Sequence, residues 1–448
     1  LFLKGHDEKV NGKKKSYAQK FFDGFNRGFS ATVKKYGKSV HFLYRHKWIT
    51  GGILALAVLG IWWSSTVVKT GFVPDEDRGI IFLNVELPAG SSIDRTHQVN
   101  AELYKKLRQI PGVKEGSVVE GRSFLGGAGS NFGLGFIRLD DWNEREEDSL
   151  SIESITAKMF GVAAQIPEAN IIFFAPPSIP GFSSSAGVEV NLLDKTGGSF
   201  TDLDKANQDF IAKLSARPEI LYAQSSFNTA YPQYELVLNA PLAKELGVPI
   251  SSIFSTLQGY IGGIFAADFS RFGKQYRVYV QSLPEDRADK NDLDNLYVRT
   301  GSGDMTPITE FVTLKRVYGP QSVTRFNLFN SANITAATNP GFSSGDAIKA
   351  VEEVAATLPS NYTTAYSGLT REEVNAGNQT TTIFLLSLVF VYFLLAAQYE
   401  SYLIPFSVLL SLPLGIFGAY ITTQLAGLQN NIYFQIALIM LLGLLAKN

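Results

Sequence analysis

The sequence contains no cysteine among its 448 residues. A disulfide scaffold and a thiolate metal site are therefore both excluded. Histidine is also scarce, since the chain contains only His6, His41, His46 and His97. These four histidines are not spaced as in any metal-binding motif. Charged residues make up only 18% of the chain and the formal net charge is −1, so the overall charge gives no indication of binding to nucleic acid.

Hydrophobic residues make up 45% of the chain, and many of them lie in four long runs that are nearly free of charge. The runs are residues 48–70, 380–399, 402–427 and 430–448. A helix rises about 1.5 Å per residue, so about 20 apolar residues cross the roughly 30 Å hydrocarbon core of a bilayer. A buried core helix is the alternative for any single run. Because four such runs are present, we predict a bundle of transmembrane helices.

The arm before the first run, residues 1–47, is strongly basic. Its only acidic residues are Asp7, Glu8 and Asp23, whereas lysine and arginine occur throughout it. Positive residues flanking a span mark the cytoplasmic side, so the arm is predicted to be cytoplasmic. The long segment between the first two runs, about residues 69–380, is then predicted to lie on the other side of the membrane.

Within the basic arm, apolar residues recur at helical spacing, opposite the lysines. They are Phe21, Phe22, Phe25, Phe29, Val33, Tyr36 and Val40. This pattern predicts an amphipathic helix that lies in the inner interface of the bilayer. A helix packed against another domain would have the same pattern, so this alternative stays open.

The external segment contains a repeated pattern of a strand, an amphipathic helix, a proline and a second strand. The prolines are Pro111, Pro167, Pro218 and Pro359. Two consecutive β-α-β patterns make a β-α-β-β-α-β unit, which is the ferredoxin-like split βαβ sandwich. We predict one sandwich at residues 71–183 and a second at residues 184–229 and 319–370. The predicted fold is therefore a membrane α-helical bundle plus an α+β external region.

The second pair of prolines is much farther apart than the first pair. The excess chain between Pro218 and Pro359 predicts an insertion near residues 230–318. This segment has helix-like and strand-like patterns of its own, so we predict a mixed α/β subdomain inserted into the second sandwich.

Four stretches of the sequence carry a family resemblance. They are GFVPDEDRGIIFLNVELPAGSSIDRT (71–96), LGVPISSIFSTLQGYIGG (246–263), AAQYESYLIPFSVLLSLPLG (396–415) and LLAKN (444–448). In their order and spacing they resemble the C-terminal half of multidrug efflux transporters of the resistance-nodulation-cell division (RND) superfamily, of the hydrophobe/amphiphile efflux type. The resemblance covers nearly the whole chain.

The resemblance implies a transporter with twelve spans, of which this chain would hold spans seven, eight and nine and most of span ten. It implies that the two sandwiches are porter subdomains and that the insertion is a docking subdomain. It also implies a homotrimer in the inner membrane of a Gram-negative bacterium. The expected partners are a periplasmic adaptor protein and an outer-membrane channel. The energy source would be the proton motive force, with no bound cofactor.

Lys447 lies in the last apolar run. A lysine at bilayer depth is costly and is by default a functional candidate. The resemblance implies that Lys447 is the cationic member of a proton relay, paired with acidic residues of the fourth span. Those acidic residues would lie outside this chain.

A glycine-rich segment, EGRSFLGGAGSNFGLGF, occupies residues 120–136. No Gly-Lys-Ser or Gly-Lys-Thr follows it, so a phosphate-binding loop is disfavoured, and a long hairpin is an alternative. The resemblance implies a flexible switch loop beside the drug pockets. Its glycines would be Gly121, Gly126, Gly127 and Gly129.

The same resemblance implies substrate-binding residues in this segment. Phe124 and Phe136 coincide with aromatic pocket positions of the family. Arg122 stands where a loop phenylalanine is usual in the family, and an arginine there would favour anionic or polar substrates. Phe132, in the same segment, is a candidate to take the place of that missing phenylalanine. In the later stretch at residues 171–182, Phe173 resembles an entrance-pocket residue of the family. For its neighbour Phe174, a position in the core of a strand is an equally good interpretation.

No pair of carboxylates or activated nucleophile points to an enzyme. We therefore expect a proton-driven exporter of hydrophobic or amphiphilic compounds such as drugs, dyes and detergents. A heavy-metal exporter of the same superfamily is one alternative, which the absence of cysteine and the presence of only three methionines disfavour. A membrane-anchored binding or assembly remnant that does not transport is another.

Overall fold

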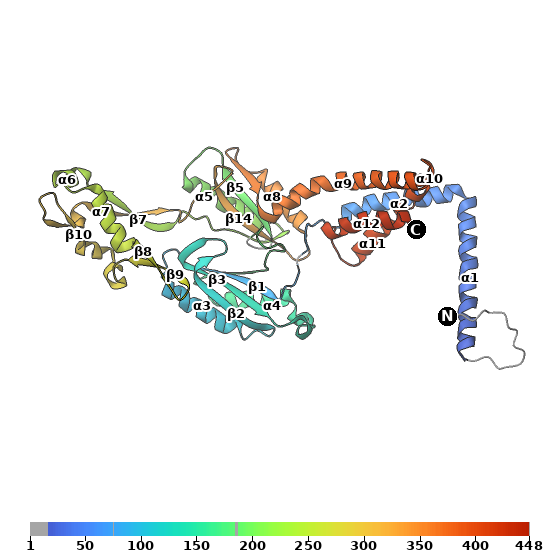
Figure 1. Ribbon diagram of the computed structural model, residues 1–448, viewed down its shortest axis with the longest axis horizontal. Coiled ribbons are helices and arrows are strands. Elements are labelled where there is room, and N and C mark those ends of the chain that lie inside the picture. The colour runs from blue at the N-terminus through green and yellow to red at the C-terminus, as the bar shows by residue number, and fades with distance from the viewer. Residues whose placement is uncertain (1–16, 75, 184–186, 448) are drawn as a thin grey trace, which may run out of the picture. The chain divides into compact units, whose positions relative to one another are not determined.

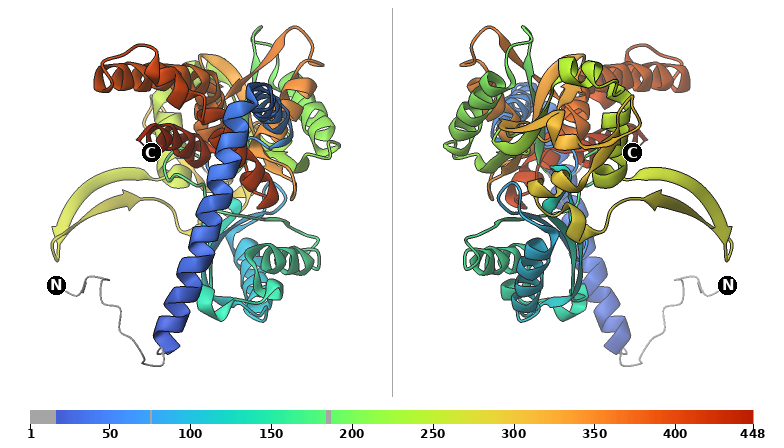
Figure 2. Two further views of the ribbon diagram at one scale, coloured as in Figure 1. Left: turned by 90° about the vertical axis from the view of Figure 1, so that its right-hand side faces the viewer. Right: turned by 90° about the vertical axis from the view of Figure 1, so that its left-hand side faces the viewer.

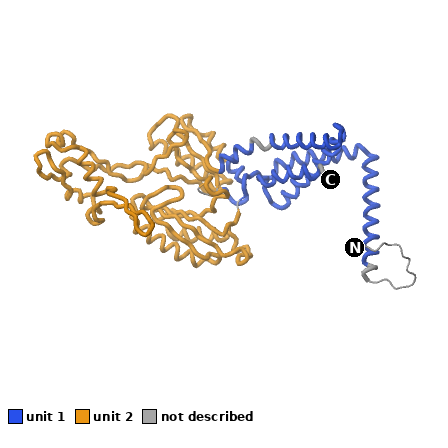
Figure 3. Tube along the Cα trace, viewed as in Figure 1, with its two compact units in different colours: residues 1–75, 338–349, 369–448 blue, residues 76–337, 350–368 orange. Residues whose placement is uncertain are grey.

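The structure is a computed structural model that describes residues 17–74, 76–183 and 187–447, without the side chains of residues 17–20, 378–381, 446 and 447. The chain divides into two compact units (Figure 3). Unit 1 comprises residues 1–75, 338–349 and 369–448, and unit 2 comprises residues 76–337 and 350–368.

Unit 1 consists mainly of helices (Figure 1). They are α1 (Tyr17–Arg45), α2 (Lys47–Val67), α9 (Gly368–Gln398), α10 (Ile404–Leu409), α11 (Leu412–Leu425) and α12 (Ile432–Lys447). Helix α11 packs against α2 and α12. Glycines allow these close approaches, because a side chain at Gly60 would collide with the Phe417 ring and one at Gly415 would collide with Leu445. Small residues at contacts of this kind are typical of helices that pack within membranes.

The four apolar runs differ in how well their helices fit a bilayer. Within the described part of the chain, Lys47–Val67 and Ile404–Leu425 are long and apolar enough to cross a membrane. A third span results if Gly368–Gly377 and Thr382–Gln398, which meet at a bend of 46°, are taken as one. The fourth run forms a shorter apolar helix, Ile432–Leu445.

The first part of unit 2 is a four-stranded sheet with two helices on one face (Figure 1). Its elements are β1 (Ile80–Glu86), α3 (Ile93–Leu107), β2 (Val113–Ser123), β3 (Gly127–Leu139), α4 (Ile152–Ala163) and β4 (Asn170–Phe174). The antiparallel strands lie in the order β2-β3-β1-β4. Ser92 and Ser151 accept hydrogen bonds from the first turns of α3 and α4, which fixes where each helix begins.

Alternate residues of these strands point toward the helices. Ile81, Leu83 and Val85 of β1 pack in one core with Leu103 of α3 and Met159 of α4. Because successive side chains of a strand point to opposite faces, the even-numbered residues of β1 point to the other face of the sheet. We call this other face the open face.

The second sheet of unit 2 follows the same chain order. Its elements are β5 (Val188–Asp194), α5 (Phe200–Ser215), β6 (Ile220–Ser225), β13 (Thr324–Phe326), β14 (Phe329–Thr338), α8 (Ser344–Ala355) and β15 (Tyr362–Tyr366). Residues 338–349, which include the first half of α8, are counted with unit 1. The strand order is β13-β14-β5-β15, and β6 also pairs with β14. Apart from the short β13, the strands therefore have the same arrangement as in the first sheet.

Between β6 and β13 the chain forms a separate set of elements with its own core around Ile253 and Phe311. They are β7 (Tyr231–Leu238), α6 (Ala240–Glu245), α7 (Ile250–Leu257), β8 (Ile264–Arg271), β9 (Lys274–Val280), β10 (Tyr297–Arg299), β11 (Met305–Pro307) and β12 (Val312–Gly319). The strands pair two by two, as β12 with β7, β8 with β9 and β10 with β11. Hairpin β8–β9 projects as a two-stranded arm, drawn in yellow (Figure 2).

Candidate ligand-binding face

A cluster of phenylalanine rings lies on the open face of the first sheet. The rings of Phe82 and Phe124 are stacked, with centroids 4.8 Å apart and planes only 3° from parallel. Phe136 stands edge-on to both, at 5.2 Å from Phe82 and 5.6 Å from Phe124. Phe174 also stands edge-on to both rings, with its centroid 5.9 Å from that of Phe82 and 5.7 Å from that of Phe124. Stacked and edge-on pairs at these distances are favourable ring geometries. We call these four side chains the aromatic face.

The register of the sheet explains this cluster. Phe82 of β1 lies directly opposite Phe136 of β3 on one side and Phe174 of β4 on the other. Three neighbouring strands therefore place one phenylalanine each in a row on the same face. Phe124 reaches the row from the turn between β2 and β3.

A buried asparagine holds that turn in place. Asn84 is 2% exposed, and its Oδ1 accepts hydrogen bonds from Ser123 Oγ at 2.7 Å and from the Phe124 backbone N–H at 3.1 Å. Ser123 Oγ in turn accepts from the N–H groups of Leu125 at 3.0 Å and Gly126 at 2.8 Å. The position of the Phe124 ring thus depends on Asn84, which the sequence analysis did not single out.

The predicted switch-loop glycines form the end of the β2–β3 hairpin. Gly121 and Gly127 have φ of 80° and 84°, which glycine adopts without strain. A side chain at Gly126 would lie 2.7 Å from the Phe132 ring, and one at Gly129 would lie 2.9 Å from Asn131 Oδ1. The hairpin alternative therefore describes this structure, and switching stays a prediction.

The other predicted pocket residues lie elsewhere. Phe132 is buried next to Gly126, and Arg122 is exposed on β2 beyond an irregularity in its pairing with β3. Phe173 is 2% exposed in the core, where its ring is edge-on to Phe160 at 5.3 Å. The structure therefore brings Phe124 and Phe136 together but not these three. Phe174, one residue after Phe173, points to the opposite side and joins the aromatic face.

A cavity of about 190 Å³ adjoins the Phe124 side of the aromatic face. Its lining includes Phe124 and Leu125 together with residues of the second sheet and nearby loops. These are Glu189, Ser226, Phe227, Ser322, Thr324, Asn333 and Thr335. One side of the cavity is therefore aromatic and the other is mainly polar.

Hydrogen bonds fix the polar side of this cavity. Asn333 Nδ2 donates to Asn191 Oδ1 at 3.2 Å, and Asn191 Nδ2 donates to Ser367 Oγ at 2.9 Å. In the sequence, this polar side of the cavity is indicated by the alternation of polar and apolar residues in β5 and β14.

A carboxyl group also lies at the end of β1. Burial raises the pKa of this group, the Glu86 carboxyl, above its usual range.

Loss of the Asn84 side chain is expected to release the turn that carries Phe124. In Asn84→Ala the Phe124 N–H loses its acceptor, which costs about 1–3 kcal/mol, so its amide should exchange with solvent roughly 5- to 150-fold faster. Hydrogen-exchange mass spectrometry of residues 120–130 measures this. Asn143→Ala, at an exposed position in the same sandwich, is the control. Unchanged exchange in Asn84→Ala would show that the turn holds without Asn84.

Apolar helices long enough to cross a membrane, combined with an aromatic sheet face beside a cavity, are typical of a membrane protein that handles apolar ligands. Residues 1–448 match the AcrB/AcrD/AcrF family, and the chain belongs to it. The family predicted from the sequence motifs is thereby confirmed.

Among similar proteins is the toluene efflux pump membrane transporter TtgB of Pseudomonas putida, 36% identical over 430 residues, which are 96% of this chain and 41% of TtgB. The multidrug export protein AcrF of Escherichia coli is 32% identical over 433 residues, 96% of this chain and 42% of AcrF. The multidrug resistance protein MdtF, also of Escherichia coli, is 30% identical over 432 residues, 95% of this chain and 41% of MdtF. The chain thus spans about two fifths of the length of these relatives.

Proposed function

We propose that this chain is part of a proton-driven efflux transporter that exports hydrophobic and amphiphilic compounds such as drugs, dyes and detergents. Membership in the family supports transport, and the names of the relatives support toluene and multiple drugs as the kinds of substrate. The observation that carries the proposal is the aromatic face, a set of four rings beside a cavity.

The aromatic face suits a broad range of substrates. Phenylalanine rings offer large apolar area and few directional constraints, so ligands of different shape gain similar burial energy. Phe136 is 41% exposed and is therefore accessible to a ligand. The hydrogen-bonded amides across the cavity would orient the polar end of an amphiphile.

We assign both sandwiches to the ferredoxin-like fold and to the porter subdomains, on the basis of their β-α-β-β-α-β order and their shared strand arrangement. The insertion between β6 and β13 is assigned to the docking subdomain. A homotrimer, a periplasmic adaptor protein and an outer-membrane channel complete the proposal. Its location is the inner membrane of a Gram-negative bacterium, with α2 and α9 to α12 as spanning segments.

Lys447 is the last residue of α12, and its side chain lies outside the described residues. Its role as the cationic member of a proton relay is part of the proposal. The membrane potential supplies roughly 2.3 kcal/mol per elementary charge per 100 mV, which is the source of energy that such a relay would use.

The alternative of heavy-metal export is less well supported. Thioether sulfur is the soft ligand that this chain could offer to such metals. Met159 is fully buried in the core of the first sandwich, where it contacts apolar side chains. Within the described residues, no group of three or more His, Asp or Glu side chains is arranged to hold a metal ion.

Replacement of Phe136 by alanine is expected to change which compounds are exported while expression stays normal. The ring is partly exposed, so its loss removes ligand contact area more than core packing. Susceptibility of cells carrying the full-length reading frame, measured across many drugs and dyes, tests this. The matched control is Phe254→Ala, an exposed phenylalanine of α7 in the insertion. An unchanged susceptibility profile in Phe136→Ala would remove the aromatic face from the substrate path.

A further inference from the structure

Helix α1 exposes two chemically opposite faces. Between residues 21 and 45 nearly every side chain is exposed. One face carries large apolar side chains that are 47% to 71% exposed. They are Phe21, Phe22, Phe25, Phe29, Val33, Tyr36 and Val40. The other face carries the basic side chains Arg27, Lys34, Lys35, Lys38 and Arg45.

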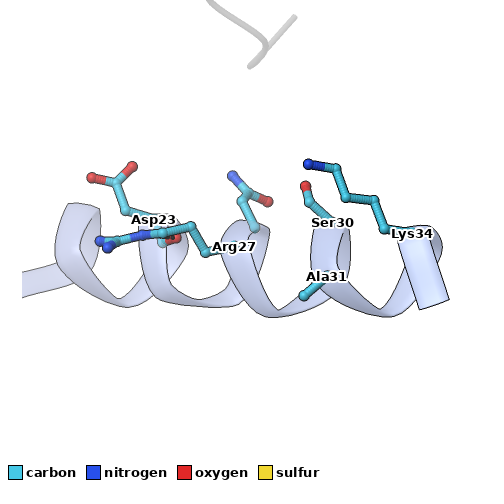
Figure 4. Close-up of a pocket in the computed structure, with 6 residues that line it drawn as sticks. Asp23, Arg27, Ser30, Ala31 and Lys34 are labelled. Carbon is cyan, nitrogen blue, oxygen red and sulfur yellow. Dashed lines mark hydrogen bonds between the residues drawn. The ribbon is translucent and has the colours of Figure 1, made fainter.

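The helical repeat separates these residues cleanly. With 3.6 residues per turn, the apolar side chains fall on one side and the basic ones on the opposite side. Figure 4 shows part of the polar side, with Asp23, Ser30 and Lys34 pointing one way and Ala31 pointing away from them. Arg27 lies along the helix, where its Nε donates to the Asp23 carbonyl at 3.3 Å. Asp23 is the one acidic residue of α1, so the helix has a strong positive charge.

Helix α1 continues directly into a candidate span. The chain turns at His46, whose N–H donates to the Phe42 carbonyl at 3.0 Å, and α2 begins at Lys47. Thr50 Oγ1 donates to the Leu43 carbonyl at 2.9 Å, which ties the end of α1 to the start of α2. In Figure 1, α1 runs across the direction of α2. A helix that crosses the direction of a span at its basic end is placed along the membrane surface.

We propose that α1 binds anionic phospholipids. Its phenylalanines would enter the boundary between headgroups and acyl chains, while its lysines and arginines would contact phosphate-bearing headgroups. Charge complementarity supports this occupant, because a basic helix gains electrostatic energy on an anionic surface and not on a zwitterionic one. Continuity with α2 supports it as well, since the span holds α1 at the bilayer. The inference rests on the membrane location in the proposed function but does not depend on transport.

The absence of cysteine provides a direct test. Thr32→Cys, at an exposed position on the apolar face, takes one environment-sensitive fluorophore. The full chain is placed in nanodiscs of phosphatidylethanolamine alone or with one quarter phosphatidylglycerol. The fluorophore should enter an apolar environment more completely when phosphatidylglycerol is present, and this difference should shrink at high salt.

Charge and apolar variants separate the two contributions. Lys34→Gln/Lys35→Gln/Lys38→Gln should weaken the association of α1 with the anionic discs by about 100-fold, with little change in the zwitterionic discs. Phe22→Gln/Phe25→Gln should weaken the association of α1 with the bilayer in both the anionic and the zwitterionic discs. The matched control removes three exposed lysines of unit 2 and should leave the signal unchanged. It is Lys105→Gln/Lys205→Gln/Lys274→Gln.

Three outcomes would overturn the proposal. Equal signals in the two kinds of disc would show that headgroup charge is not recognised. An apolar fluorophore signal that is not quenched by phospholipids brominated on their acyl chains would show that α1 packs on protein. Displacement by inorganic phosphate, but not by chloride at the same ionic strength, would show a site for the free anion. Backbone hydrogen exchange of residues 21–45 verifies that each variant keeps the helix. Loss of drug export in any variant bears on the proposed function and leaves this inference unaffected.

Discussion

Alanine at position 447 is expected to abolish export while the protein still assembles. A lysine in an apolar span is costly unless it is paired, and in the proposed relay protonation of the partner loosens that pair. Without the ammonium group, the proposed relay has no pair through which a proton could change the packing of α12. Dye accumulation in cells that express the full-length reading frame measures export, and native electrophoresis measures assembly.

Two controls make this result specific to the charge. Leu444→Ala, at an exposed position of the same helix, should retain export. Lys447→Arg keeps the charge but has a different shape and hydrogen-bond geometry, so only partial export is expected. Normal dye efflux in Lys447→Ala would show that Lys447 is not part of a proton relay.

Phe173→Ala is expected to destabilise the first sandwich by about 3–5 kcal/mol, because it leaves a cavity in a closely packed core. The ring is 2% exposed and contacts Phe160 edge-on. Pulse proteolysis of the purified full-length protein measures the change in the free energy of unfolding. Expression should fall in the same variant.

Phe136→Ala is the matched comparison, since it removes the same side chain from a partly exposed site of the same sheet. It should lose clearly less stability than Phe173→Ala. The entrance-pocket role that the family resemblance implies for Phe173 makes the opposite prediction. A Phe173→Ala protein of normal stability with an altered drug profile would favour that role over the core position.

The amphipathic helices of the two sandwiches could be predicted from the sequence because each of them buries one stripe of side chains. Thr96, Val99, Leu103 and Leu107 recur at helical spacing in the sequence, and all four are buried along α3. Apolar periodicity reports which side of a helix is buried without any knowledge of the neighbouring elements.

The face of a strand was harder to predict. The run IIFF at residues 171–174 is apolar at every position, so alternation gives two faces but does not say which of them meets the helices. For this reason the sequence did not show that Phe173 lies in the core while Phe174 lies on the aromatic face. Pairing with β1 decides the outcome, since it sets Phe174 opposite Phe82.

The contacts that complete the candidate site are also beyond sequence patterns. Asn84 and Phe124 are 40 residues apart, and their hydrogen bond depends on how the β2–β3 hairpin folds over β1. The polar side of the cavity comes from the second sheet, through Asn333 and Glu189. Neither residue is part of a motif, and only the tertiary fold places them near Phe124.

Transport by the purified full-length protein in proteoliposomes, driven by an imposed pH gradient, tests the central claim most directly. A fluorescent amphiphile that is quenched on one side of the membrane reports its movement. The account predicts transport that begins when the gradient is applied, stops when an ionophore collapses it, and is absent in Lys447→Ala. Transport at the same rate with and without the gradient, or no transport of any amphiphile by an assembled protein, would contradict it.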